Sequence, residues 1–517
     1  MKKIYLLLMC NLFCSVLYAQ QGLGTYLKDV IQKQEKGIMV TAKLIEACGL
    51  CDSLDIILDE AYEKLYQSGQ IPASIQTGYY TFYAPAHRKY GFTLFAETDE
   101  FWENVLGKDY KSIAATDVAG YIQQNCVFAS MYPDNVDFTN PRSMLYQFVT
   151  YHLLNRRLMP TSLVNHVNEL GYSMTSRQLT IPICEYYTTM GDRRLLRTYE
   201  SAESNGIYLN RFPILDNGRK GTYHELSCAP EKTGIRIDTE MAISAANAII
   251  YPISNLLAYD QATVNNLGSI RLRMDVASFF PEMATNGIRL NKSNFDSDRN
   301  VWFPNGIYPY LDDLIINDAR STFCYFTGYM RSWNNMQGDE FNCSGIQDIT
   351  LRLPPFPRRG TYELRLALQG ASTARGIYQV YFGSDPDRLY PIGMPVDFRQ
   401  NAEYIRLPNG YINSFIGYEE DTNDDYYNQM RDNELHESGF LKGCNQYCAA
   451  YDINKPMRMS FSNLRRILCR MTMDSSCTYY LRFKSVLDSP TAELYLDYIE
   501  FCPREVYDNP LQPEDIW

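Results

Sequence analysis

Three carboxylates near the end of the chain could supply an acid–base pair. Glu493, Asp497 and Glu500 lie close together in a strand-like run, and paired carboxylates hydrolyse glycosidic bonds. Strand alternation places Glu493 and Asp497 on one face and Glu500 on the other. We therefore expect no single cluster and interpret all three as edge or solvent-face residues. A polysaccharide-acting enzyme that uses strand or loop carboxylates is the alternative hypothesis.

Other catalytic patterns are missing from the sequence. It contains no nucleophile elbow, phosphate-binding loop, dinucleotide fingerprint or zinc-protease helix motif. The chain has 5 His among 517 residues, which leaves few candidates for a general base. His152 falls on the apolar side of an expected helix, where a core histidine is the simpler interpretation. We predict a protein that is not an enzyme and has neither cofactor nor catalytic metal.

One short segment has oxygen ligands at alternating positions, as a calcium loop does. It runs from Asn294 through Asp296 and Asp298 to Asn300. The glycine and the closing glutamate of a complete calcium loop are missing. Whether residues 294–300 bind calcium therefore stays open.

Aromatic residues are abundant, with 42 Tyr and 4 Trp. Aromatic planes pack on the C–H faces of sugars, and amides beside them supply hydrogen bonds. The candidate sugar-binding residues are Trp302, Tyr329, Trp333, Asn334 and Asn335, with Tyr325, Tyr378 and Tyr381 as further ring candidates. Packing in a tyrosine-rich core explains the same aromatics equally well.

The first residues predict export. Lys2 and Lys3 precede an apolar run from Ile4 to Tyr18, so residues 1–19 are expected to be a signal peptide. The run is shorter than the roughly 20 residues of a membrane-spanning helix, and no later segment is long enough. A lipid anchor at Cys10 is less favoured because Met9 is bulky. We expect the protein in the periplasm or at the cell surface.

The net charge bears on the class of partner, and the cysteines bear on disulfides and metal sites. The net charge of -12 makes nucleic acid and anionic membrane surfaces poor partners. Of the 14 Cys, Cys10 and Cys14 would leave with the signal peptide, so 12 remain. The two close pairs, Cys48 with Cys51 and Cys444 with Cys448, have no histidine beside them. They favour structural thiols or local disulfides over zinc, and the pairing stays open.

The elements that would position these residues change character along the chain. The first third is mainly helical, with expected helices over 38–47, over 52–66 and from Pro141 through His152, and strand-like runs at 79–84 and 92–96. The last part contains short strand-like runs separated by Pro- and Gly-rich turns, at 349–353, 362–368, 377–382, 479–483 and 494–499. Such a series predicts an antiparallel β-sandwich.

Four segments of the first half resemble landmarks of the fasciclin family. Residues 93–102 (TLFAETDEFW) resemble its first signature, and Tyr151-His152 matches its Tyr-His motif. Residues 47–54 are similar to its helix-to-turn segment and 246–257 to its closing strand. Glu97 stands where the family usually has Pro, and Ala248 where it usually has Gly.

The resemblance implies an α+β fold: a fasciclin-like wedge of a small sheet and helices over 37–260, with an insertion near 170–217. Fasciclin domains are adhesion modules, so Tyr151 and His152 become candidate contacts with a partner. Through residues 360–366 and 496–501, the second half more loosely resembles galactose-binding-like carbohydrate modules, which implies a jelly-roll-like β-sandwich over 301–517. Residues 261–300 are then a linker or the start of the sandwich.

The whole arrangement resembles exported bacterial fasciclin proteins that accompany outer-membrane glycan-uptake systems. We therefore expect a non-catalytic adhesion or binding protein of the cell envelope, with a glycan or a cell-surface protein as its partner. A purely structural protein whose sandwich packs against a partner is a further alternative. The ligand, the oligomeric state and the membrane face stay open.

Overall fold

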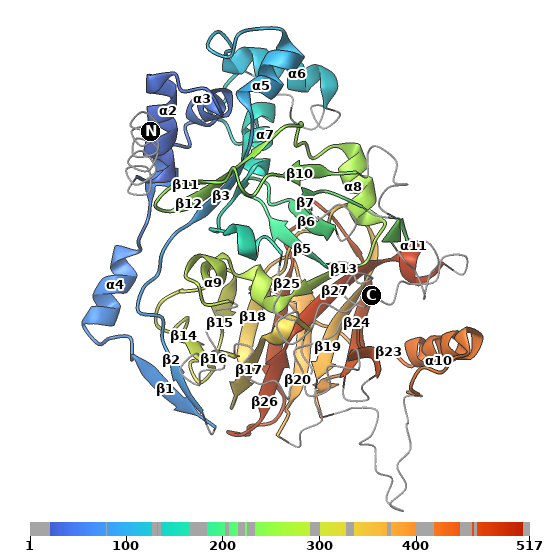
Figure 1. Cartoon of the computed structure of the whole chain (residues 1–517). Helices are drawn as coiled ribbons and strands as arrows, with labels where there is room; N and C mark the ends of the chain where they lie inside the picture. Colours follow the sequence, from blue (N-terminus) through green and yellow to red (C-terminus); the bar gives the residue numbers. More distant parts are fainter. Residues whose placement is uncertain are drawn as a thin grey trace, which may run out of the picture.

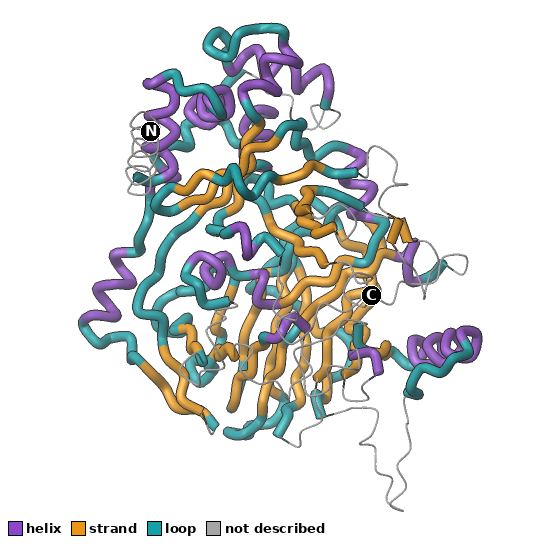
Figure 2. Tube along the Cα trace, viewed as in Figure 1, coloured by secondary structure: helices purple, strands orange, loops and turns teal. Residues whose placement is uncertain are grey.

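The computed structural model has a mixed α+β fold, with most helices near the N-terminus and several mainly antiparallel sheets beyond them (Figure 1). Figure 2 shows many of the helices gathered at one end and strands filling much of the rest, with further helices at the sides and among the strands. The structure describes residues 21–78, 80–126, 132, 136–164, 183–201, 206–212, 214–215, 223–224, 233–289, 300–326, 336–369, 374–399, 418–444, 457–459 and 463–509. The expected signal peptide, 1–19, lies outside these ranges.

The N-terminal helices form their own hydrophobic core. They are α2 (Leu23–Lys33), α3 (Met39–Ala47), α5 (Asp99–Leu106), α6 (Ala115–Asn125) and α7 (Met144–Tyr151). Helix α4 (Glu60–Gln67) instead packs through Tyr62 into the larger core that the strands form. The predicted end of the helix over 38–47 is confirmed, because Gly49 adopts the left-handed φ of 69° that glycine tolerates best. Ser143 caps α7 by accepting a hydrogen bond from the Tyr146 N–H.

The single helix predicted over 52–66 is wrong. A short 3-10 helix (Ser53–Asp55) is followed by Ile56–Leu58, which are exposed and not helical, and α4 begins only at Glu60. Asp59 explains the interruption, because its carboxylate accepts a hydrogen bond from the Tyr62 N–H and starts a new helix. The apolar spacing alone did not reveal this internal cap.

A small sheet lies between the helices and the rest of the molecule. Its strand order is β11 (Ile243–Ser244), β12 (Ala248–Ile253), β3 (Phe92–Glu97) and β4 (Leu153–Leu154). Strand β12 runs parallel to β3, from Ala248 opposite Phe92 to Ile253 opposite Glu97. Leu94 and Ile250 pack into the helical core, whereas Phe95 and Tyr251 pack into the large core on the other side. Both faces are covered, which is why β3 and β12 are nearly continuously apolar.

A second small sheet has the order β10 (Ile235–Ile237), β7 (Gly206–Leu209), β6 (Leu195–Ser201) and β5 (Ile183–Thr188). All its pairs are antiparallel. It falls largely within the segment 170–217 that the sequence marked as an insertion. A separate two-stranded pair joins β8 (Ile214–Leu215) and β9 (Tyr223–His224).

Three larger sheets share the main hydrophobic core. The five-stranded sheet has the order β13 (Leu272–Asp275), β27 (Tyr498–Pro503), β19 (Gly360–Gln369), β24 (Asn463–Met473) and β23 (Phe440–Lys442). One six-stranded sheet has β15 (Leu314–Ile316), β18 (Asp348–Arg352), β25 (Tyr480–Ser485), β20 (Ile377–Gly383) and β21 (Tyr390–Pro391), with β22 (Val396–Asp397) also on β20. The other has β1 (Ser74–Thr77), β2 (Tyr80–Tyr83), β14 (Val301–Phe303), β16 (Phe323–Phe326), β17 (Glu340–Ser344) and β26 (Glu493–Leu496).

Strands distant in sequence complete these sheets. β1 and β2 come from the N-terminal third, and β2 pairs with β14 between Tyr83 and Val301. β13, which precedes residue 300, pairs with β27 near the C-terminus. The chain beyond residue 300 therefore depends on earlier segments for part of its sheets.

The remaining helices are α8 (Gln261–Gly268), α9 (Pro281–Thr285), α10 (Asp425–Glu437) and α11 (Arg504–Tyr507), and the remaining 3-10 segments are Pro160–Ser162, Val276–Phe279, Met336–Gly338 and Met457–Met459. Helix α10 lies at the side of the molecule near β23 (Figure 1). Of the helices in the described ranges, none is long and apolar enough to cross a membrane.

Candidate functional site

The structure places the two candidate contact residues of the Tyr-His motif in the interior. Tyr151 and His152 are each 2% exposed. The Tyr151 hydroxyl donates to the Leu195 carbonyl at 3.3 Å and accepts from the Asn210 amide at 3.0 Å. Neither side chain reaches the surface in this arrangement, so the placement lends no support to a direct contact with a partner.

His152 instead forms a buried pair with Glu97. Its Nδ1 donates to the Phe148 carbonyl at 2.7 Å, and its Nε2 lies 2.7 Å from Glu97 Oε1. The Leu257 N–H donates to the same carboxylate oxygen at 3.1 Å. The interpretation of His152 as a satisfied core histidine is confirmed. The pair joins the end of α7 to the end of β3.

Replacing His152 should therefore cost far more than replacing a surface histidine in a similar pair. His152→Ala leaves the Glu97 carboxyl group buried without its main partner, and we expect a loss of about 3 kcal/mol in the free energy of unfolding. His87, which is 2.9 Å from Glu63 and has an exposed side chain, is the matched control. His87→Ala should cost less than about 1 kcal/mol. Urea denaturation measures both, and equal losses would contradict the structural role assigned to His152.

Most of the candidate sugar-binding aromatic residues that the structure describes are buried rather than exposed. Trp302, Tyr325 and Tyr378 belong to the hydrophobic core, with Trp302 8% exposed and both tyrosines 0%. The alternative interpretation, core packing, holds for these three rings. Tyr381 is half-buried beneath the Arg482 guanidinium. Tyr329, Trp333, Asn334 and Asn335 lie outside the described residues, as do positions 294–299 of the calcium-like segment.

The carboxylates near the C-terminus are separated, but two of them are not on the solvent face. Glu493 forms an ion pair with Arg375 and is half-buried. Asp497 and Glu500 are 1% and 0% exposed, so their prediction as edge or solvent-face residues is wrong. The expected run is two strands, β26 and β27, separated at Asp497, and the alternation does not continue across that break.

Glu500 lies among four buried arginines on one face of the five-stranded sheet. Its carboxylate is 2.6 Å from Arg273, 2.9 Å from Arg465, 3.3 Å from Arg365 and 3.6 Å from Arg271. Burial acts to raise the pKa of Glu500, but the charges of Arg465 and the other arginines outweigh it and lower the pKa well below its usual range. The group is therefore a structural anion at neutral pH.

Asp497 belongs to a second buried cluster, which is mainly acidic. Asp275, Asp339 and Glu185 surround Arg289, at 3.5, 3.3 and 3.7 Å from its guanidinium nitrogens. The Met336 N–H donates to both oxygens of Asp497. Burial, with neighbouring carboxylates, raises the pKa values of Asp275 and Asp497 well above normal. In the described ranges, no three His, Cys, Asp or Glu side chains are arranged to hold a metal ion.

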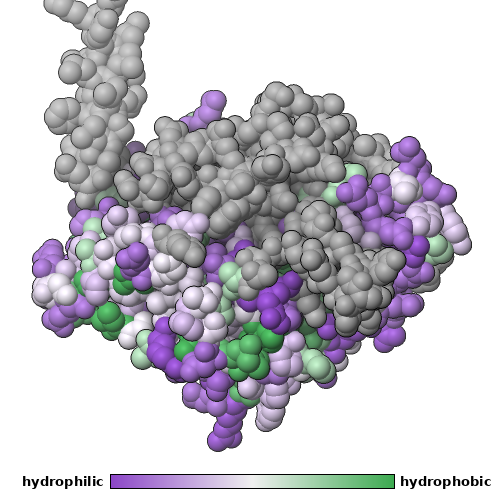
Figure 3. Space-filling view, turned by 90° about the horizontal axis from the view of Figure 1, so that it is seen from below, coloured by the Kyte–Doolittle hydropathy of each residue, from purple (hydrophilic) through white to green (hydrophobic). Residues whose placement is uncertain are grey.

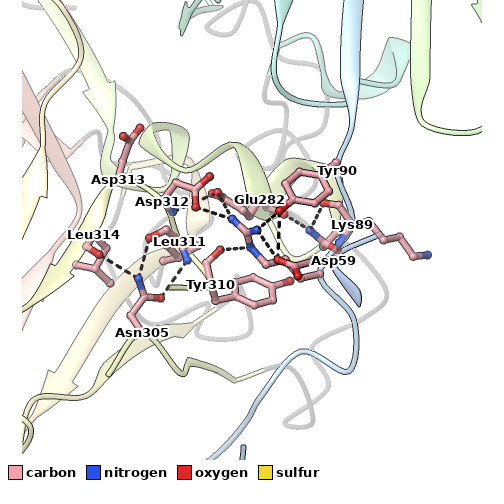
Figure 4. A network of polar contacts seen from close by, with 12 residues as sticks. Asp59, Lys89, Tyr90, Glu282, Asn305, Tyr310, Leu311, Asp312, Asp313 and Leu314 are labelled. Carbon is pink, nitrogen blue, oxygen red and sulfur yellow. Dashed lines mark hydrogen bonds and ion pairs between the residues drawn. The ribbon is translucent and has the colours of Figure 1, made fainter. Parts of the chain in front are cut away.

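A third polar network surrounds Arg88, which is buried; Figure 4 labels its partners Asp59, Glu282 and Asp312. Its Nη1 donates to Asp59 Oδ2 at 2.8 Å, and its Nη2 donates to Glu282 Oε1 at 3.3 Å and to Asp312 Oδ1 at 2.6 Å. Its Nε donates to the Tyr310 carbonyl at 2.8 Å. These partners come from the cap of α4, the first turn of α9 and the loop between β14 and β15. Arg88 thus joins N-terminal segments to the large core.

The two carboxylates that share Arg88 Nη2 have different environments. Glu282 is buried, whereas the Asp312 side chain is 64% exposed. Burial, followed by the negative charge of Asp312, raises the pKa of Glu282 to about 7. The second oxygen of Glu282 is buried without a hydrogen-bond partner, which also favours the protonated form. A carboxylic acid beside a solvated carboxylate is an arrangement that can transfer protons near neutral pH.

The raised pKa of Glu282 predicts that stability falls as pH rises. The folded protein binds this proton more tightly than the unfolded chain, so the contribution is complete below pH 4.5 and is lost as pH rises towards about 7. At 1.36 kcal/mol per pH unit, the loss is about 3 kcal/mol. Glu282→Gln should remove this part of the pH dependence in urea denaturation at several pH values. Glu505→Gln, at an exposed carboxylate, should leave it unchanged; identical curves for all three proteins would contradict the prediction.

The described cysteines are free thiols, which bears out the structural-thiol interpretation for the close pair Cys48 and Cys51. Burial raises the pKa of Cys48 to about 12 and that of Cys51 to about 11. Such thiols are protonated and poorly reactive at neutral pH. In the other close pair, Cys444 is buried, and Cys448 lies outside the described residues.

Sequence reasoning missed the Arg88 network entirely. Arg88, Asp59, Glu282 and Asp312 lie on four separate segments and follow no local spacing. The one available signal was Asp59, whose position before a helical pattern is typical of a cap.

No protein-family model matches the chain, and no curated protein matches it significantly.

Proposed function

We propose that the protein is an exported, non-catalytic binding or adhesion protein of the cell envelope. In this proposal residues 37–260 form a fasciclin-like wedge, and the later strands form a jelly-roll-like sandwich. A glycan or a cell-surface protein is its partner. Fold resemblance alone is a weak argument for function, so the proposal depends on how the landmark segments meet.

One observation carries the proposal: the closing strand β12 lies parallel to β3, the strand of the first signature, with the helices packed on one face. The Tyr-His motif meets the same signature through the contact between His152 and Glu97. Glu97 stands where the family usually has Pro, and its carboxyl group contacts His152 Nε2 and accepts a hydrogen bond from the Leu257 N–H, neither of which a proline side chain could do. The departure from the family pattern therefore has a local structural reason.

The glycan form of the proposal now depends on residues other than the buried rings. Trp302 offers no stacking face. In the view of Figure 3, the coloured part of the surface carries hydrophobic residues in small groups among hydrophilic ones.

A glycan array tests the proposal directly. The protein without residues 1–19 is labelled and screened in parallel against the array and against a panel of purified cell-surface ectodomains. All residues from 20 onward are kept, rather than the C-terminal region alone, because β1, β2 and β13 complete the sheets of that region. Saturable binding to one class of partner is the expected result. Silence on both panels would reject the binding proposal.

A polysaccharide-acting enzyme is the second candidate, and the Glu282–Asp312 pair favours it. Both carboxyl groups contact one guanidinium nitrogen, and glycoside hydrolysis pairs a carboxylic acid of raised pKa, as Glu282 is, with an ionised carboxylate. Incubation with a polysaccharide panel and measurement of new reducing ends decides between the candidates. Release that Glu282→Gln and Asp312→Asn both abolish would replace the binding proposal with the enzymatic one.

A further inference from the structure

An open cleft lies between the two small sheets. Its volume is about 870 Å³. One wall is formed by β10 and β7, and the other by the end of β12, where Pro252 and Ile253 are followed by Ser254. Thr98, which caps α5, lines the same cleft. The cleft is distinct from the three buried networks described above.

The strand at the cleft wall is an edge strand. β10 is at the end of the order β10, β7, β6, β5 and pairs within the described residues only with β7, through Arg236 opposite Tyr208. An edge strand presents backbone N–H and C=O groups that can pair with an added strand. The cleft therefore suits an extended segment of polypeptide.

The charge of the cleft is complementary to a basic ligand. Among the described residues that line it, Glu200, Asp238 and Glu240 carry carboxylates, and Arg236 is the one cationic side chain. Asp238 and Glu240 are exposed in a turn in which the Glu240 N–H donates to the Asp238 carboxylate at 3.1 Å. The side chains facing a ligand are therefore predominantly negative.

The other lining residues also fit a peptide better than a sugar. Ile207, which is half-buried, and Met241, which is 62% exposed, supply apolar area for the side chains of an extended chain. Of the described residues that line the cleft, none is aromatic. A sugar would therefore find no ring for stacking on these residues, whereas aliphatic stems of lysine or arginine can pack on Ile207 and Met241 while their charged ends reach the carboxylates.

We propose that this cleft binds an extended, lysine- or arginine-bearing segment of a partner protein, which adds to β10 and places basic side chains against Asp238 and Glu240. The inference rests on the proposed binding function and names its partner as a protein with a basic segment. Charge complementarity and the open strand edge together select this occupant.

The test uses a synthetic octapeptide of alternating lysine and valine, acetylated, amidated and fluorescently labelled. Fluorescence polarisation with the protein lacking residues 1–19 should show saturable micromolar binding. The same peptide with glutamate for lysine should not bind. Raising the ionic strength from about 0.05 to about 0.5 M should weaken the binding markedly, because exposed charge pairs are screened.

Three variants locate the site. Asp238→Asn with Glu240→Gln should raise the Kd about tenfold, and Ser254→Trp, at an exposed position in the cleft, should abolish binding by filling it. Asp385→Asn with Asp387→Asn is the matched control, because these exposed acids form a similar turn elsewhere, in which the Asp387 N–H donates to Asp385 at 3.0 Å. The control removes the same charge and should leave the Kd within twofold. Circular dichroism checks that each variant is folded.

Each outcome of these experiments either supports or overturns the assignment of the cleft. Absence of peptide binding, equal weakening by both acid pairs, or binding that survives Ser254→Trp would overturn the assignment of the cleft. If the array or ectodomain panel identifies a partner that the Ser254→Trp protein still binds with the same Kd, the cleft inference fails while the binding function stands. If both panels and the peptide are silent, both proposals fail.

Discussion

Glu500→Ala is expected to cause the largest loss of stability among single substitutions in the buried networks. Removing this carboxylate takes away the anion that Arg273, Arg365 and Arg465 share, in an interior where the glutamate is fully buried. Of these three, Arg365 keeps a second carboxylate, Glu363, at 2.6 Å. Breaking one buried ion pair costs about 3 to 5 kcal/mol because the remaining charge is uncompensated. Four arginines share this anion, so we expect at least about 5 kcal/mol, or failure to fold.

Urea denaturation monitored by circular dichroism measures the effect. Glu500→Gln provides a second variant that keeps an oxygen acceptor of the same shape, and it should fold with a smaller loss of about 3 kcal/mol. Glu505→Ala is the matched control, because its partner Arg358 is 2.9 Å away in an exposed pair and the substitution should cost less than about 1 kcal/mol. A fully folded Glu500→Ala protein within 1 kcal/mol of wild type would contradict the charge network described here.

Arg88→Ala is expected to have the second largest effect, with a loss of about 4 kcal/mol. The substitution leaves Asp59 and Glu282 as buried carboxyl groups without their cation. Asp59 keeps the hydrogen bonds from the Tyr308 hydroxyl and the Tyr62 N–H, and Glu282 can take up a proton. These compensations keep the expected loss below that for Glu500→Ala.

The loss at Arg88 should also depend on pH. Without the guanidinium, the pKa of Glu282 should rise further from its value of about 7, so the variant should be destabilised more at pH 8 than at pH 5. Asp312→Asn is the control within the same network, because its exposed side chain should contribute less than about 1 kcal/mol. An equal loss for Arg88→Ala at both pH values would show that the charge of Glu282 does not set the effect.

Local sequence patterns predicted the type and approximate position of many elements correctly. The helix over 38–47, the helix ending near His152 and the strands at 92–96 and 377–382 all correspond to observed elements. Each has its own periodic apolar spacing and its own end signal, such as Gly49, and these are properties of neighbouring residues. The helix interruption at Asp59 and the strand break at Asp497 were not predicted. A single polar residue interrupts an apolar pattern only when its hydrogen-bond partners are in place in the folded protein.

The candidate sites depended much more on distant segments. The sequence identified Asp497 and Glu500 as residues of interest, but their burial depends on β13 and β19, which pair with β27 from far away in the chain. The same holds for Arg88, whose partners Glu282 and Asp312 are about 200 residues later. A one-dimensional pattern contains no information about which distant charges will share a buried space.

By itself, then, the sequence determined the α+β character, the location of the main helices and strands and the core role of His152. These follow from side-chain periodicity, capping and hydrophobicity, which act between near neighbours. Only the tertiary structure decided which carboxylates are buried, which arginines neutralise them and where an open cleft lies between two sheets. Electrostatic free energy depends on burial and on distances through space, and neither is set until the sheets have assembled.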